Sequence, residues 1–167
     1  LAQQPAPLKA FLLQTSILDR LCGDLCNAVT GQTLGQSTLE QLHQANLFVV
    51  SLDSERGWYR YHQLFRELLR KQLQHEAAAS LPELHRRAGQ WCEAHALIEE
   101  AVEHALAAHD ADILGRLLDD HAEAFFLRGE HVTLMHWIAA LPDMERRARP
   151  ALGALQAILL SAAGKVQ

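Results

Sequence analysis

Apolar side chains recur with the spacing of an amphipathic helix along residues 11–29. The pattern is interrupted near Thr15, and Gly31 follows its last member, so it predicts two short helices. Residues 1–10 precede this pattern and contain two prolines, which is typical of a linker. The chain therefore begins, in this interpretation, with a linker followed by a helical domain.

The period of the pattern then changes. Ser37 and Glu40 have the spacing of a capping box, which predicts a third helix from Ser37 to about Asn46. Residues 47–52 are rich in aromatic and β-branched side chains and predict a strand, and residues 58–61 predict the strand that returns after a polar turn. Two strands joined by a short turn indicate a β-hairpin.

From His62 the helical spacing returns, so a strand is expected to lead directly into a helix at this residue. Helices, a two-stranded wing and a following helix together predict a winged-helix domain over residues 11–78. The apolar stripe expected to face its core consists of Leu64, Phe65, Leu68 and Leu69.

Residues 79–167 predict helices only and show a loose internal repeat. Turn positions occur at Ala96, Gly129 and Gly164, which gives a period near 34 residues. Small residues precede these turns by seven positions and would lie where paired helices touch; they are Gly89, Ala122 and Ala157. We expect an array of helical hairpins similar to tetratricopeptide repeats, truncated after one helix of its third unit. The predicted fold class is thus mainly α.

Composition narrows the classes of function. The net charge of −5 gives no general attraction to nucleic acid, and no apolar run has the length of a membrane span. The three cysteines lack the spacing of a disulfide framework, which favours reduced thiols and a cytoplasmic location.

In this order, the segments resemble the MalT-like branch of the LuxR-type, ATP-dependent bacterial transcription activators. The winged-helix part carries the resemblance in residues 11–21, 39–48 and 58–65. The repeat part carries it in residues 84–88, 98–106, 127–130 and 137–142.

The resemblance implies a longer protein of which this chain is the middle. In that family an ATPase module precedes the winged helix, repeats bind an inducer, and a C-terminal helix-turn-helix binds promoter DNA. The implied partners are the ATPase module of the same chain, a small-molecule inducer or a regulatory protein, and promoter DNA through the C-terminal domain only. ATP or ADP would be the cofactor of the whole protein, with none expected on this chain, because it has no phosphate-binding loop of the G-x-x-x-x-G-K-[ST] type. We therefore do not expect this chain to be an enzyme.

By the same resemblance, His62 matches a histidine that contacts the β-phosphate of ADP in related ATPases. The position suits this role physically, because a helix N-terminus favours an anion and an imidazole adds a hydrogen-bond donor. The family motif continues with an aspartate, which Gln63 replaces here. The alternative is a histidine that only caps the helix and packs under the wing.

Other functions have less support from the sequence. The expected recognition helix has no lysine or arginine, and Arg56 and Arg60 in the wing are too few for a DNA footprint. Cys22 and Cys26 would need two further metal ligands, for which the nearby candidates are limited to His43 and acidic residues, and buried thiols are the commoner case. No nucleophile–base pair is indicated, so neither metal-binding nor catalytic residues are predicted. The acidic run at Glu99 and Glu103 is interpreted as a solvated helix face. The main alternative function is a general scaffold whose helical hairpins bind other proteins.

Overall fold

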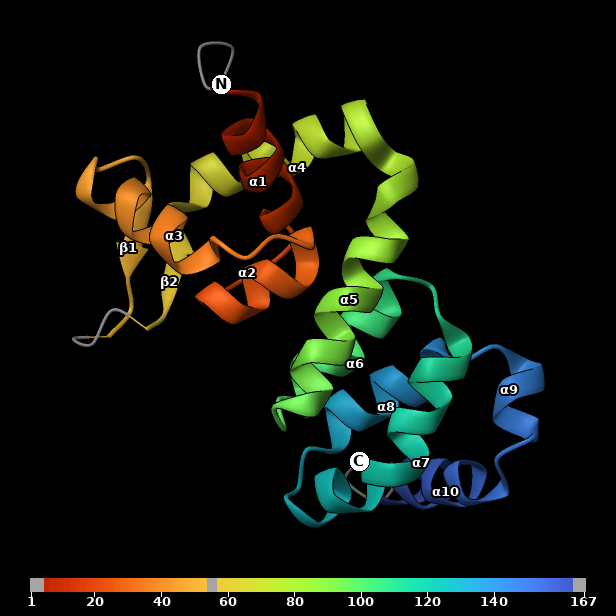
Figure 1. Ribbon diagram of the computed structural model, residues 1–167. Coiled ribbons are helices and arrows are strands. Elements are labelled where there is room, and N and C mark those ends of the chain that lie inside the picture. Colours follow the sequence, from red (N-terminus) through yellow and green to blue (C-terminus); the bar gives the residue numbers. More distant parts are fainter. Residues whose placement is uncertain (1–4, 54–56, 164–167) are drawn as a thin grey trace.

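The computed structural model describes residues 5–53 and 57–163 of the 167-residue chain. Figure 1 shows a winged helix at the upper left and stacked helices at the lower right, joined by the α4–α5 segment. The prediction of a mainly α protein with one two-stranded hairpin is confirmed for this part of the chain. The winged helix consists of α1 (Ala6–Thr15), α2 (Gly23–Thr30), α3 (Gly35–Gln44), β1 (Val49–Ser51), β2 (Tyr59–Tyr61) and α4 (Gln63–Ala77).

Two helix starts differ from the sequence prediction. Helix α1 already begins at Ala6, inside the segment assigned to a linker, because Pro7 is tolerated in the first turn of a helix. The predicted capping box at Ser37 is wrong: α3 begins at Gly35, and the Ser37 hydroxyl donates to the Leu34 carbonyl at 3.0 Å. The Gly35 N–H instead donates to the side chain of Asn27 at 2.8 Å, so a neighbouring helix satisfies this start.

The β-hairpin is antiparallel, with Val49 opposite Tyr61. The loop between α1 and α2 is joined to the hairpin by an isolated β-bridge, in which Leu21 and Tyr59 exchange two backbone hydrogen bonds of 2.7 and 2.8 Å. The side chains of Tyr59 and Tyr61 are buried, whereas Arg60 between them is exposed, as alternation along a strand requires. The hairpin is thereby fixed to the helical core.

The second half is a stack of antiparallel helices. It contains α5 (Leu81–Ala94), α6 (Ile98–Ala107), α7 (Ala111–Leu127), α8 (His131–Ala140), α9 (Asp143–Arg147) and α10 (Pro150–Ala163), and the 3₁₀ turn η1 (Ala78–Ser80) precedes it. Ala96 and Gly129 have positive φ angles of 57° and 81°, which places both predicted turns between paired helices. The third turn, Gly164, lies outside the described residues.

The small residues of the repeat have different environments. Gly89 lets α5 approach α6, since a Cβ atom there would lie 3.4 Å from the Cβ of His104. Ala122 is buried, whereas Ala157 is exposed and Leu152 and Leu159 provide the buried side chains of α10. The small-residue pattern therefore describes the first two hairpins and does not extend to α10.

The first repeat helix packs on the winged helix. Leu84 and Ala88 of α5 belong to the same buried cluster as α1, α2 and α4, while the second cluster begins at Cys92. Arg20 strengthens this joint: its guanidinium lies 4.6 Å from the centre of the Trp58 ring and pairs with Glu100 of α6. The first part of α5 consequently completes the core of the winged helix, whereas Cys92 and the buried side chains of α6 belong to the second cluster.

Candidate functional site

His62 occupies the junction between β2 and α4. Its backbone is held from both sides, because its N–H donates to the Phe48 carbonyl at 2.7 Å and its own carbonyl accepts the Arg66 N–H at 3.0 Å. The preceding Tyr61 is buried, and its hydroxyl hydrogen bonds to Thr15 at 2.7 Å. The start of α4 is thus fixed by the core, as the change of period in the sequence predicted.

The His62 side chain is exposed and makes no capping hydrogen bond to α4. Within residues 5–53 and 57–163 it has no hydrogen bond or ion pair, and it does not pack under the wing. Gln63, at the position of the family's aspartate, is also exposed and donates to Glu67 at 3.2 Å. The role of His62 as a nucleotide contact stays a prediction, and its ring is accessible for that role.

Exposed apolar side chains occur on both elements that meet at His62. On α4, Leu64 is 73% exposed and Leu68 is 53% exposed, although both were expected to face the core. Leu69 is buried as expected, and Leu73, four residues later on the same face of α4, is buried with it. On the hairpin side, Phe48 is 55% exposed and stacks on Phe65 with ring centres 4.7 Å apart.

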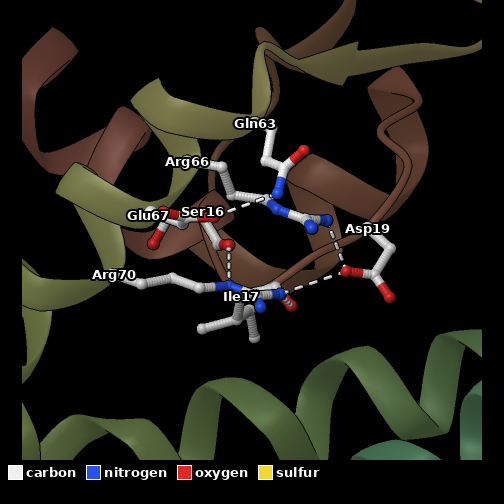
Figure 2. Close-up of polar contacts among 7 residues, drawn as sticks. All are labelled: Ser16, Ile17, Asp19, Gln63, Arg66, Glu67 and Arg70. Carbon is white, nitrogen blue, oxygen red and sulfur yellow. Dashed lines mark hydrogen bonds and ion pairs between the residues drawn. The ribbon is translucent and has the colours of Figure 1, made fainter.

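Two arginines of α4 bind the loop that follows α1 (Figure 2). Arg66 contacts Asp19 at 2.5 Å, and Arg70 contacts the same carboxylate oxygen at 3.2 Å. Arg70 also donates to the Ser16 and Ile17 carbonyls, each at 2.8 Å. These bonds satisfy loop carbonyls that follow a helix end, so the arginines position the loop against α4.

The helix that would read DNA bases in a winged helix is α3, and it carries no lysine or arginine. His43 is its only basic residue, and the ring lies 3.3 Å from the Val49 carbonyl of the hairpin. Arg60 is exposed on β2, and Arg56 lies outside the described residues. The geometry of α3 adds nothing that favours DNA contact by this domain.

The cysteines are free thiols shielded from solvent. Cys26 and Cys92 are buried and Cys22 is half-buried. Burial raises the pKa of all three thiols, to about 12 for Cys92, which keeps them protonated and unreactive. Among the described residues, no group of three or more His, Cys, Asp or Glu side chains is arranged to hold a metal ion.

Two polar contacts were missed from the sequence. The Nδ1 atoms of His85 on α5 and His104 on α6 lie 2.9 Å apart. Glu103, expected on a solvated face, accepts a hydrogen bond of 3.0 Å from the indole of Trp137 on α8. Both contacts join different helices, so spacing along one helix gave no sign of them; the 34-residue separation of Glu103 and Trp137 was the one available signal.

Comparison with known proteins places this geometry in a family. Residues 1–81 match the MalT winged helix domain. The chain is 39% identical over 155 residues to the HTH-type transcriptional regulator MalT of Klebsiella pneumoniae subsp. pneumoniae, which covers 93% of the chain. The corresponding protein of Cronobacter sakazakii is 37% identical over 152 residues, or 91% of the chain. The chain is MalT-like.

This chain spans 17% of the length of these MalT relatives. The MalT winged helix match ends at Leu81, where α5 begins, and yet the buried cluster of this domain continues into α5. In this MalT-like chain, the winged-helix match therefore ends earlier in the sequence than the buried core of the winged helix does. None of the described helices is long and apolar enough to cross a membrane.

Proposed function

We propose that this chain is a regulatory part of a MalT-like transcription regulator, in which the winged helix clamps a nucleotide and the repeats begin a sensor. The observation that carries the proposal is the exposed imidazole of His62 at the start of α4, inside a segment that matches the MalT winged helix domain. The fragment itself is not catalytic in this proposal, and the ATPase activity belongs to a module outside it.

The helix terminus supplies the chemistry of the clamp. The first N–H groups of α4 have no acceptor within the helix and, with the helix dipole, they favour a phosphate. The exposed His62 ring, which has no hydrogen bond or ion pair among the described residues, is next to them and can add a hydrogen bond to the β-phosphate of ADP. A nucleotide held jointly by His62 and the ATPase module would keep the two closed, and exchange for ATP would favour the open state.

The exposed apolar side chains support the docking of that module. Phe48, Leu64 and Leu68 flank His62 and would be covered when the ATPase module approaches. The docking would therefore bury apolar surface and place the nucleotide at α4 in one step.

The helical hairpins form the start of the sensor in this proposal. They would respond to a small-molecule inducer or a regulatory protein, while promoter DNA would be bound by a separate C-terminal domain. A cytoplasmic location accords with a transcription regulator. The support for this part is the similarity to MalT over more than 90% of the chain.

The test is ADP retention by the whole regulator after His62→Ala. Loss of a charge-assisted hydrogen bond predicts roughly tenfold or greater weakening of ADP binding. The matched control is His75→Ala, which removes another exposed histidine, from the last turn of the same helix. Equal ADP affinity in wild type, His62→Ala and His75→Ala would contradict the proposed clamp.

A second variant tests the docking surface independently. Leu64→Arg places a charge close to His62 in the chain. It is expected to weaken ADP retention, because docking of the ATPase module would then bury an unpaired charge. Val132→Arg makes the same change at a side chain on α8 that is 85% exposed and should leave retention unchanged. If both variants retain ADP like the wild type, the ATPase module does not cover Leu64.

A further inference from the structure

A cavity of about 670 Å³ opens between the winged helix and the first helical hairpin. The volume lies within the range of small-molecule pockets, and such pockets occur preferentially where two units of a fold meet. The winged helix contributes the 17–19 loop and α4, and the hairpin contributes α5 and α6. The polar part of the wall consists of Asp19, Arg70, Gln74, His85, Glu103, His104 and His109.

Arg70 presents unused donors in this cavity wall. Its Nε and Nη2 atoms bind the Ser16 and Ile17 carbonyls, and Nη2 also contacts Asp19 (Figure 2). Nη1 makes no hydrogen bond with any residue in the part of the chain that the structure describes. The guanidinium is thus fixed in position by its other atoms, which lowers the entropy cost of binding a further acceptor.

The imidazole pair faces the same cavity. The Nδ1 atoms of His85 and His104 share one hydrogen bond, so one ring donates and the other accepts. Their Nε2 atoms form no hydrogen bond with the described residues. Burial, with a smaller effect of the Arg70 charge, lowers the pKa of His85. Burial, then His85 and to a smaller extent Arg70, lowers the pKa of His104 to about 4. A negative group between these rings and the Arg70 guanidinium would therefore stabilise the protonated form of the imidazole pair.

The acidic groups nearby already have partners. Asp19 is bound by Arg66 and Arg70, and Glu103 accepts the Trp137 indole N–H. Glu100, the next acidic group along α6, pairs with Arg20. Unengaged donors in the described part of this wall include Arg70 Nη1 and the Nε2–H of the ring that accepts at Nδ1, and the other ring gains an Nε2 proton when the pair takes up a proton. Gln74 and His109 also line the cavity.

We propose that this cavity binds the phosphate or carboxylate group of a small molecule, held by Arg70 Nη1 and the Nε2 atoms of His85 and His104. Because α4 and the hairpin each contribute donors, the bound anion links the winged helix to the first repeat. The site is separate from the nucleotide contact proposed for His62 and does not depend on it.

The test is NMR of the histidine side chains of this chain, titrated with inorganic phosphate and separately with succinate, against chloride at equal ionic strength. We expect saturable shifts of the His85 and His104 resonances, and a higher apparent pKa for the protonation of the imidazole pair in the bound state, since the anion stabilises the imidazolium. Binding should strengthen as the pH falls from 7 to 6. Saturation by phosphate or by succinate supports the site and identifies the class of ligand.

Variants identify the residues responsible. Arg70→Gln should weaken binding at least about tenfold, as expected for loss of a charge-assisted contact. His104→Gln tests the imidazoles without disturbing the loop that Arg70 supports, and it should remove the pH dependence. His75→Gln, an exposed histidine of α4 outside the cavity, is the matched control and should bind like the wild type.

The proposal is overturned if neither anion produces saturable shifts in the wild type. It is also overturned if Arg70→Gln and His104→Gln, with unchanged melting temperatures, bind as tightly as His75→Gln.

Discussion

The indole N–H of Trp137 on α8 donates a 3.0 Å hydrogen bond to Glu103 on α6, which lies 34 residues, or about one repeat, earlier in the chain. Trp137 is buried and also meets Phe125 edge-on, with ring centres 4.9 Å apart. A residue of one hairpin thereby contacts the equivalent region of the hairpin before it, which is the nearest-neighbour packing that stabilises repeat proteins.

Trp137→Phe should therefore destabilise the repeats. It keeps an aromatic ring and loses the hydrogen bond to a carboxylate, so we expect a loss of about 1–3 kcal/mol in the free energy of unfolding, measured in urea. Glu103→Gln keeps an acceptor oxygen and should cost less. Val132→Ala, at an exposed position of α8, serves as the control. A Trp137→Phe protein as stable as that control would show that the bond contributes nothing.

Leu84→Ala should loosen the winged helix although Leu84 lies in the first repeat helix. Leu84 is 4% exposed and belongs to the winged-helix cluster, so its truncation should cost about 2–5 kcal/mol. Amide hydrogen exchange should accelerate in α1 and α4. The matched change Leu117→Ala, in the second cluster, should accelerate exchange mainly in α7 and α8. Identical exchange patterns in the two variants would mean that the clusters unfold as one unit.

Gly35→Ala should destabilise the protein, because α2 and α3 approach closely at this glycine. A Cβ atom there would lie 2.4 Å from the Gly23 carbonyl oxygen, so the backbone must shift at a cost of about 1–3 kcal/mol. Gly153→Ala in α10 meets no atom within 4 Å and should stabilise by about 0.5–1 kcal/mol through helix propensity. The melting temperatures of both variants test these two expectations. A Gly35→Ala protein that melts at or above the wild-type temperature would contradict the close approach of α2 and α3.

Acidification should destabilise the first hairpin through His104. Burial, and then the neighbouring His85, lowers the pKa of His104 from 6.5 to about 4 in the folded protein. The unfolded chain binds the proton more readily, so this contribution is present above pH 6.5 and is lost as the pH falls through 4, by up to about 1.4 kcal/mol per pH unit.

His104→Gln should show a shallower loss of stability over the same pH range, measured as the difference between urea unfolding curves. His75→Gln should follow the wild type, since His75 is exposed at the far end of α4. Parallel pH profiles for wild type and His104→Gln would exclude a buried neutral imidazole at position 104.

The order of helices, the hairpin and the turns could be predicted from the sequence because these features depend on local periodicity and turn chemistry. The start of α4 at His62 followed from a change of period, and the turns at Ala96 and Gly129 followed from the repeat. The start of α3 was less predictable, since a tertiary partner replaced the expected cap at Ser37: the Asn27 side chain accepts the Gly35 N–H.

Residue types and spacing alone therefore determined the mainly α class, the winged-helix order and the position of His62 on a helix tip. Only the tertiary structure decided which faces are buried, because the rotation of α4 against the core exposes Leu64 and Leu68 and buries Leu73. It also decided that α5 completes the winged-helix core, and that Arg70 meets His85 and His104 at one cavity. These contacts join elements distant in the chain, and a local hydrophobic pattern carries no information about which distant surfaces will meet.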